Sequence, residues 1–303
     1  MKTPLIIGAG KGWCATSPLH LTLQCATKCS HTGILKEDHL LYNIYNKDAW
    51  GWREYWYKRL VNDSMTPNWK HPYGYQSKYG FHNNLEEIEE LFTRNPTLQT
   101  YIKYYKRHYQ RVKHEYKYVH DFSNSNALLP RNFLAKIAPV LKKHFDIKVL
   151  MIFRDPVRRL YSELSQKYQD SPNLQKSYNT SKDYWKSYLK KGEITQNSDY
   201  IWSFKSYNEF FSTISIVSEE LWGEKNNCQE KLAKFLDFDI KELWPNAYFP
   251  EMGTKAPHHE YLKDQWSSDL EDLTEEDLAF GRKHMKRYYD EWYDYFGSMP
   301  WRC

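Results

Sequence analysis

An arginine and a serine eight residues apart, Arg154 and Ser162, have the spacing of a phosphate-binding element. The mostly apolar run 147–151 predicts a strand that ends near Arg154. Asp155 and Pro156 then predict a helix start, because Asp caps helices and Pro suits their first turn. An arginine fork contacts phosphate in a bidentate manner, and a serine hydroxyl adds one more hydrogen bond. The alternative is a surface arginine paired with Asp155.

A second anion-binding pattern lies near the N-terminus. Leu5–Gly8 predicts a short buried strand, and the residues Ala-Gly-Lys-Gly-Trp-Cys-Ala-Thr-Ser at 9–17 lead into an apolar helix. A strand, a Gly-rich turn and a helix direct backbone N–H groups and a positive helix end at an anion. The nucleoside-triphosphate motif GxxxxGK[ST] is absent, and Lys11 comes early in the loop. The alternative is a tight turn that only joins a strand to a helix.

Together, these two elements resemble the sulfotransferase family that uses 3′-phosphoadenosine 5′-phosphosulfate (PAPS) and releases adenosine 3′,5′-bisphosphate. The N-terminal loop resembles the family's 5′-phosphosulfate loop, and Arg154 through Ser162 resembles its 3′-phosphate element. Segments 118–130, 214–221 and 228–238 resemble later family motifs, and the loop 253–258 loosely resembles a nucleotide loop. The resemblance implies that the donor is bound by Lys11, Gly12, Trp13, Cys14, Ala15, Thr16, Ser17, Arg154, Ser162 and Lys255.

The segment Lys36-Glu37-Asp38-His39 resembles the acceptor-site segment of the heparan-type branch of this family. The resemblance implies that Glu37 is the general base, a role that contributes about 10²–10⁴-fold in rate. His39 would orient Glu37 or the acceptor and serve as a second base. Lys11 would neutralise charge on the departing oxygen, supported by the loop N–H groups. The alternative for this segment is a solvated turn.

Two departures from the family pattern bear on the substrate. In the 5′ loop, either Trp13-Cys14-Ala15 replaces the Gly-Thr-Thr core or two residues are inserted before Ala15-Thr16-Ser17. In addition, Phe122 stands where heparan-type enzymes carry a lysine. Loss of that cation argues against a highly anionic acceptor. The predicted function is metal-free transfer of the PAPS sulfonate to a hydroxyl of a glycan or another hydroxylated metabolite. The alternatives are a nucleoside-triphosphate-dependent kinase of related fold and a catalytically silent glycan-binding protein.

Strands alternate with helices, which predicts an α/β fold with a central, mainly parallel sheet flanked by helices; the resemblance makes this a P-loop-like nucleotide-binding fold. Ligands then bind at the carboxyl ends of the strands, where the N-terminal loop, Glu37 and Arg154 would meet. We expect a single domain over 1–303, with an exposed insertion around 170–196 and a C-terminal helical segment around 260–297. Predicted strands are Leu5–Gly8, Ile34–Lys36, Lys117–His120, Lys148–Phe153 and Ile214–Val217, and predicted helices are Pro18–Thr27, Leu85–Thr93, Thr97–Glu115, Pro130–His144, Pro156–Tyr168, Tyr184–Lys190, Asn208–Ser212, Cys228–Leu236 and Glu275–Phe296.

The composition sets limits on class and location. The net charge of +5 suits anionic ligands but is too small to indicate nucleic acid. Five scattered cysteines argue against a disulfide framework, and Cys25, Cys29 and His31 lack the further ligands of a zinc site. No segment is apolar enough to span a bilayer, and no signal peptide precedes the first strand. We therefore expect a cytoplasmic enzyme of a microbe or a virus, without membrane insertion.

Overall fold

The computed structural model describes residues 2–14, 16–26, 28–33, 37–51, 53–54, 57–58, 89, 91–192, 198–222, 227–239 and 273–301. Several sequence predictions fall outside these ranges. They are the strand over Ile34–Lys36, most of the helix over Leu85–Thr93, and the loop that contains Lys255.

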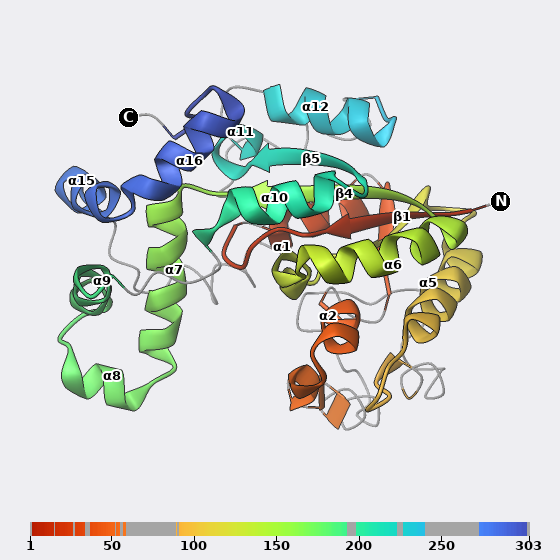
Figure 1. Ribbon diagram of the computed structural model, residues 1–303, viewed down its shortest axis with the longest axis horizontal. Helices are drawn as coiled ribbons and strands as arrows, with labels where there is room; N and C mark the ends of the chain where they lie inside the picture. Colours follow the sequence, from red (N-terminus) through yellow and green to blue (C-terminus); the bar gives the residue numbers. More distant parts are fainter. Residues whose placement is uncertain are drawn as a thin grey trace.

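The strands described form one sheet in the order β2-β3-β1-β4-β5, and each neighbouring pair is parallel. The predicted α/β fold with a parallel central sheet flanked by helices is therefore confirmed (Figure 1). Residues 149–153 of β4 are fully buried, as expected of a strand that is covered on both faces. The strands are β1 (Thr3–Gly8), β2 (Ser30–Thr32), β3 (Tyr118–Asp121), β4 (Phe145–Phe153) and β5 (Ser212–Val217).

Strand β2 lies just before the segment in which a strand is predicted. Its three residues are polar yet buried, and side chains far away in the sequence bond to Ser30 and His31. His120 Nδ1 lies 2.8 Å from Ser30 Oγ, and His31 Nδ1 lies 2.9 Å from His108 Nε2. An apolar strand pattern cannot reveal such a strand, because tertiary contacts make its burial possible.

Helices cover the sheet on both sides. Figure 1 shows α6 and α10 across one face, and α7, α8, α9 and α15 grouped beyond the carboxyl ends of β1 and β4. The helices are α1 (Thr16–Leu21), α2 (Leu40–Tyr45), α5 (Leu98–Val112), α6 (Arg131–His144), α7 (Pro156–Gln169), α8 (Pro172–Ser177), α9 (Ser181–Lys190), α10 (Tyr200–Asn208), α11 (Ser218–Trp222), α12 (Asn227–Leu236), α15 (Glu275–His284) and α16 (Lys286–Phe296), with the π-helix η1 (Thr22–Ala26) and the 3-10 helices η2 (Lys47–Ala49) and η4 (Asn124–Leu128).

Two helix predictions are wrong in detail. The segment Asn208–Ser212 is not a helix of its own, because Asn208 ends α10, Ser212 begins β5 and the residues between them join the two elements. The helix over Glu275–Phe296 is two helices, because Met285 leaves the helical conformation while its side chain stays fully buried.

Residues 172–177 and 181–190, within the segment expected to be an insertion, form α8 and α9. Trp185 and Leu189 of α9 are buried. The Trp185 ring packs edge-on against Tyr161 of α7 and Phe280 of α15. This part of the chain therefore contributes to the packing of the helices beyond the sheet.

Candidate active site

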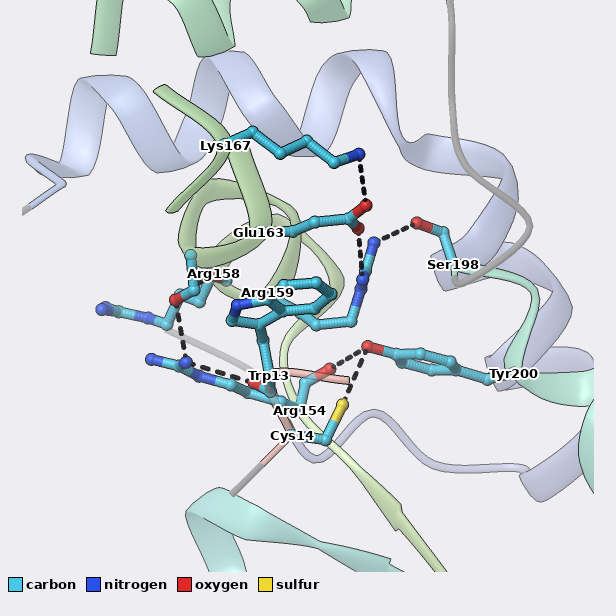
Figure 2. Close-up of polar contacts among 10 residues, drawn as sticks. Trp13, Cys14, Arg154, Arg158, Arg159, Glu163, Lys167, Ser198 and Tyr200 are labelled. Carbon is cyan, nitrogen blue, oxygen red and sulfur yellow. Dashed lines mark hydrogen bonds and ion pairs between the residues drawn. The ribbon is translucent and has the colours of Figure 1, made fainter. Parts of the chain in front are cut away.

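Arg154 joins the two predicted anion-binding elements. It follows β4, and its Nη1 donates to Ser162 Oγ at 3.0 Å and to the main-chain oxygen of Trp13 at 3.3 Å (Figure 2). Trp13 belongs to the loop that follows β1, the neighbour of β4 in the sheet. The strand order therefore brings together two segments that are about 140 residues apart in the sequence.

Arg158 adds a second cation to this surface. Its side chain is exposed, whereas Arg154 is half-buried. Figure 2 shows both guanidinium groups pointing to the same side of the loop. Sequence analysis did not select Arg158, although its place one turn after Arg154 on a predicted helix was a usable signal.

Asp155 is engaged at the start of α7. Its Oδ1 accepts from the backbone N–H groups of Val157 at 2.9 Å and Arg158 at 3.1 Å, which confirms the predicted helix cap. The same oxygen accepts from the hydroxyl of Tyr289 at 3.0 Å, and Arg282 lies 4.0 Å from Oδ2. These contacts occupy the carboxylate that the alternative interpretation would pair with Arg154.

The loop after β1 packs tightly on its surroundings. A Cβ atom at Gly10 would lie 2.7 Å from Thr16 Cγ2 and 3.2 Å from Ile152 Cβ, so only glycine fits without a shift. Trp13 has a φ of 64°, in the left-handed region, and its side chain is 38% exposed. The loop therefore has a strained residue, Trp13, at its tip, and at its base Gly10 lies close to Thr16 and Ile152.

Cys14 and Tyr200 lie beneath the arginine. The Cys14 thiol is fully buried, 3.8 Å from the Tyr200 hydroxyl, and burial raises its pKa to about 11. That hydroxyl donates to the main-chain oxygen of Arg154 at 2.9 Å. Cys14 is therefore a neutral thiol at neutral pH, and Tyr200 fixes the backbone from which the guanidinium extends.

Lys11 lies in different surroundings. Its side chain is fully buried, and Nζ donates to the main-chain oxygen of Ala127 at 3.3 Å and lies 5.9 Å from the ring centre of Trp202. Burial and, to a lesser extent, the charge of Arg159 lower the pKa of Lys11 to about 7, although Asp199 partly offsets them. Lys11 and Arg154 thus flank one loop but face different groups. The catalytic role of Lys11 stays a prediction.

A chain of hydrogen bonds joins the end of the loop to Glu37. Thr16 Oγ1 donates to Asn124 Oδ1 at 3.1 Å, and Asn124 Nδ2 donates to Glu37 Oε1 at 2.9 Å. Gly12 is buried in the same loop, and a Cβ there would approach Asn124 Nδ2 to 4.0 Å. Ala15 and the side chain of Ser17 lie outside the described residues. The structure therefore brings Thr16 and Glu37 to one place, with Asn124 between them.

His39 lies beside Glu37. Its Nε2 is 3.7 Å from Glu37 Oε2, and its Nδ1 is 2.7 Å from Ser125 Oγ. Sequence analysis missed both Asn124 and Ser125. The run Ser-Asn-Ser-Asn at 123–126, shortly after the predicted strand Lys117–His120, was the signal that could have found them.

Phe122, at the position of the missing lysine, belongs to the core. It is fully buried, and a Cβ at Gly8 would come within 2.6 Å of its ring. In the described part of the chain, no three His, Cys, Asp or Glu side chains gather as a metal site. Across the same ranges, no helix is long and apolar enough to cross a bilayer. Lys255 lies outside them.

Comparison with known proteins gives a likeness to a solved structure. No known family profile matches the sequence, and no curated protein matches it. Among solved structures, the sulfotransferase domain of the olefin synthase from Synechococcus PCC 7002 is similar to this chain, with 14% sequence identity and a TM-score of 0.44. The match covers 94% of this chain and 96% of that domain. At this level of likeness, the site has to be interpreted from its own geometry.

Proposed function

We propose that this protein is a sulfotransferase that moves the sulfonate group of PAPS to a hydroxyl of an acceptor. The observation that supports this most directly is the position of Arg154, which is hydrogen-bonded both to Ser162 and to the loop after β1. One ligand with anionic groups at both ends could therefore contact both elements. When bound, PAPS supplies an activated sulfonate group.

The 3′-phosphate end of the donor fits the side chains of Arg154 and Ser162. Arg154 Nη1 already bonds to a hydroxyl, and its half-buried guanidinium retains further N–H groups for a phosphate. The exposed Arg158 on the same side adds attraction for a dianion. These donors favour a nucleotide with a 3′-phosphate over one without it.

At the phosphosulfate end of the donor, Lys11 has to exchange its hydrogen bond to Ala127 for a contact with the donor. Its ammonium group donates to Ala127, and burial keeps its pKa near 7, so a part of the lysine population is neutral at neutral pH. An anion beside Nζ favours the protonated form. Donor binding is therefore expected to restore the charge that Lys11 needs to balance the departing oxygen.

Glu37 is the proposed general base. Asn124 holds one of its carboxylate oxygens, and His39 lies beside the other. A carboxylate held at one oxygen can accept the acceptor's proton at the other. The buried Phe122 provides no cation here, which favours a glycan or another hydroxylated metabolite without dense negative charge.

The test is transfer of labelled sulfonate from PAPS to a panel of neutral glycans and hydroxylated metabolites. We expect transfer by the wild type, and a loss of about 10²-fold or more in Glu37→Gln. Glu230→Gln, an exposed position on α12, is the matched control and is expected to retain the wild-type rate. Magnesium-dependent consumption of ATP in place of sulfonate transfer would overturn the proposal, as would equal rates for wild type and Glu37→Gln.

A further inference from the structure

Two buried carboxyl groups, Asp38 and Asp121, lie behind the proposed base. Asp38 follows Glu37 in the chain and is 2% exposed, whereas Asp121 ends β3 and is fully buried. Neither group has a place in donor binding or in the proton transfer assigned above. Buried carboxyl groups are costly unless hydrogen bonds satisfy them, so their partners indicate what they do.

Asp38 is tied to three different parts of the fold. Its Oδ2 accepts from the hydroxyl of Tyr105, on α5, at 2.6 Å. Its Oδ1 accepts from the backbone N–H of Leu40 at 2.8 Å and from Ser123 Oγ at 3.4 Å. Arg53 Nε donates to the main-chain oxygen of Asp38 at 2.9 Å. The residue is thus fixed through its side chain and its backbone.

Asp121 holds the opposite side of the same cluster. Its Oδ1 accepts from the backbone N–H of Ser123 at 3.0 Å, and its Oδ2 accepts from Tyr101 at 3.2 Å. Tyr101 and Tyr105 are one turn apart on α5, with ring centres 4.6 Å apart. Ser123 therefore links the two carboxyl groups, and one helix contributes a hydroxyl to each.

The cluster ends at the residues that surround Glu37. The backbone N–H of His39 donates to Ser123 Oγ at 2.9 Å, and His39 has a φ of 53°, in the left-handed region. Such a conformation persists only where its surroundings fix it. The contacts of Asp38 and Ser123 therefore fix the chain on the C-terminal side of Glu37, while Asn124 holds its carboxylate.

We infer that Asp38 is a positioning residue for Glu37, and that its contacts with Tyr105 and Ser123 set the direction in which the Glu37 carboxylate points. Burial and the neighbouring Asp121 both raise the pKa of Asp38, whereas the hydrogen bonds from Tyr105 and Leu40 and the charge of Arg53 oppose them. The kinetic part of this inference rests on the proposed function.

The experiment compares Tyr105→Phe and Asp38→Asn with Tyr118→Phe. Tyr118 is a matched control because its buried hydroxyl donates to the Leu236 main-chain oxygen at 3.0 Å, away from this cluster. Hydrogen exchange of the backbone amides of His39 and Leu40 provides a readout that needs no activity. It also separates local loosening from a fall in global stability.

We expect Tyr105→Phe and Asp38→Asn to increase exchange at both amides about 10-fold beyond the change in the most protected core amides. We also expect kcat to fall by about 10-fold while KM for the donor stays constant, since only the base is displaced. Tyr118→Phe is expected to change neither the exchange at these two amides relative to the core amides nor kcat. Equal local exchange in all three variants would overturn the positioning role. Increased exchange with no sulfonate transfer by any form, wild type included, would support the positioning of this segment and refute the proposed function.

Discussion

Asn124 Nδ2 lies 2.9 Å from Glu37 Oε1, while its Oδ1 accepts from the hydroxyl of Thr16. A single amide thus connects the loop after β1 to the proposed base. The two ends of this link come from segments that follow β1 and β2, and Asn124 itself follows β3. Three neighbouring strands therefore determine where Glu37 lies.

Replacing Asn124 by Ala should lower kcat about 10-fold, because Glu37 loses the donor that orients it. Asn124→Asp should lower it further, since a second carboxylate beside Glu37 raises the pKa of the base and moves the acid limb of the rate profile to higher pH. The measurement is the pH–rate profile of sulfonate transfer. Asn132→Ala, an exposed position on α6, is the control, and a shift of equal size there would contradict the prediction.

Lys11→Met should abolish turnover and leave the protein folded. The substitution keeps most of the buried side-chain volume and removes a charge whose burial is costly. The pKa of Lys11 is about 7 in the folded state against 10.5 unfolded. The unfolded state therefore binds more protons between these values, so this group makes the wild type more stable as pH rises from 7 towards 10.5. Urea unfolding at pH 7 and 9 should show that slope in the wild type and a smaller one in Lys11→Met. If the free energy of unfolding had the same pH dependence in both proteins, this would contradict the buried position of Lys11.

The pair His31–His108 should make the fold sensitive to mild acid. Burial lowers the pKa of His31 to about 4 and places that of His108 well below 6.5. Both side chains stay neutral in the folded state and become protonated in the unfolded state below pH 6.5. Stability should therefore fall as pH drops from 6.5 towards 4, by up to about 1.4 kcal/mol per pH unit for each group. The measurement is urea unfolding at pH 7 and 5. His108→Gln, which does not titrate, should show a shallower decrease, and an unchanged slope would refute this assignment.

Gly10→Ala should destabilise the protein by about 1–3 kcal/mol, because the new methyl group overlaps Thr16 and Ile152. It should also weaken donor binding, since the loop that bonds to Arg154 has to shift. Gly51→Ala is the control, because nothing lies within 4 Å of a Cβ there. Thermal unfolding of both variants provides the comparison. A Tm for Gly10→Ala that equals that of Gly51→Ala would show that the loop is not closely packed.

Much of the fold could be predicted from the sequence because most of the strands are apolar runs that alternate with helical patterns. Strand β2 could not, since Ser30 and His31 are buried only through partners that lie far along the chain. The helix start at Asp155 was predictable because its cap is local in sequence.

The candidate site was likewise predictable only where it depends on local sequence. Arg154 and Ser162 lie on one strand–helix unit, so their hydrogen bond follows from local structure. The burial of Lys11 depends on Ala127 and Trp202, which only the folded chain brings to it. Asn124 escaped prediction for the same reason, as its two partners lie in segments that follow different strands.

The central claim is that Arg154 and the loop after β1 bind one nucleotide with a 3′-phosphate. Calorimetry with adenosine 3′,5′-bisphosphate and with adenosine 5′-phosphate tests it most directly. We predict micromolar affinity of the wild type for the bisphosphate, little for the monophosphate, and loss of this preference in Arg154→Ala but not in Arg131→Ala, an exposed arginine paired with Glu209. Equal affinity for the two nucleotides, or a preference that survives in Arg154→Ala, would contradict the account.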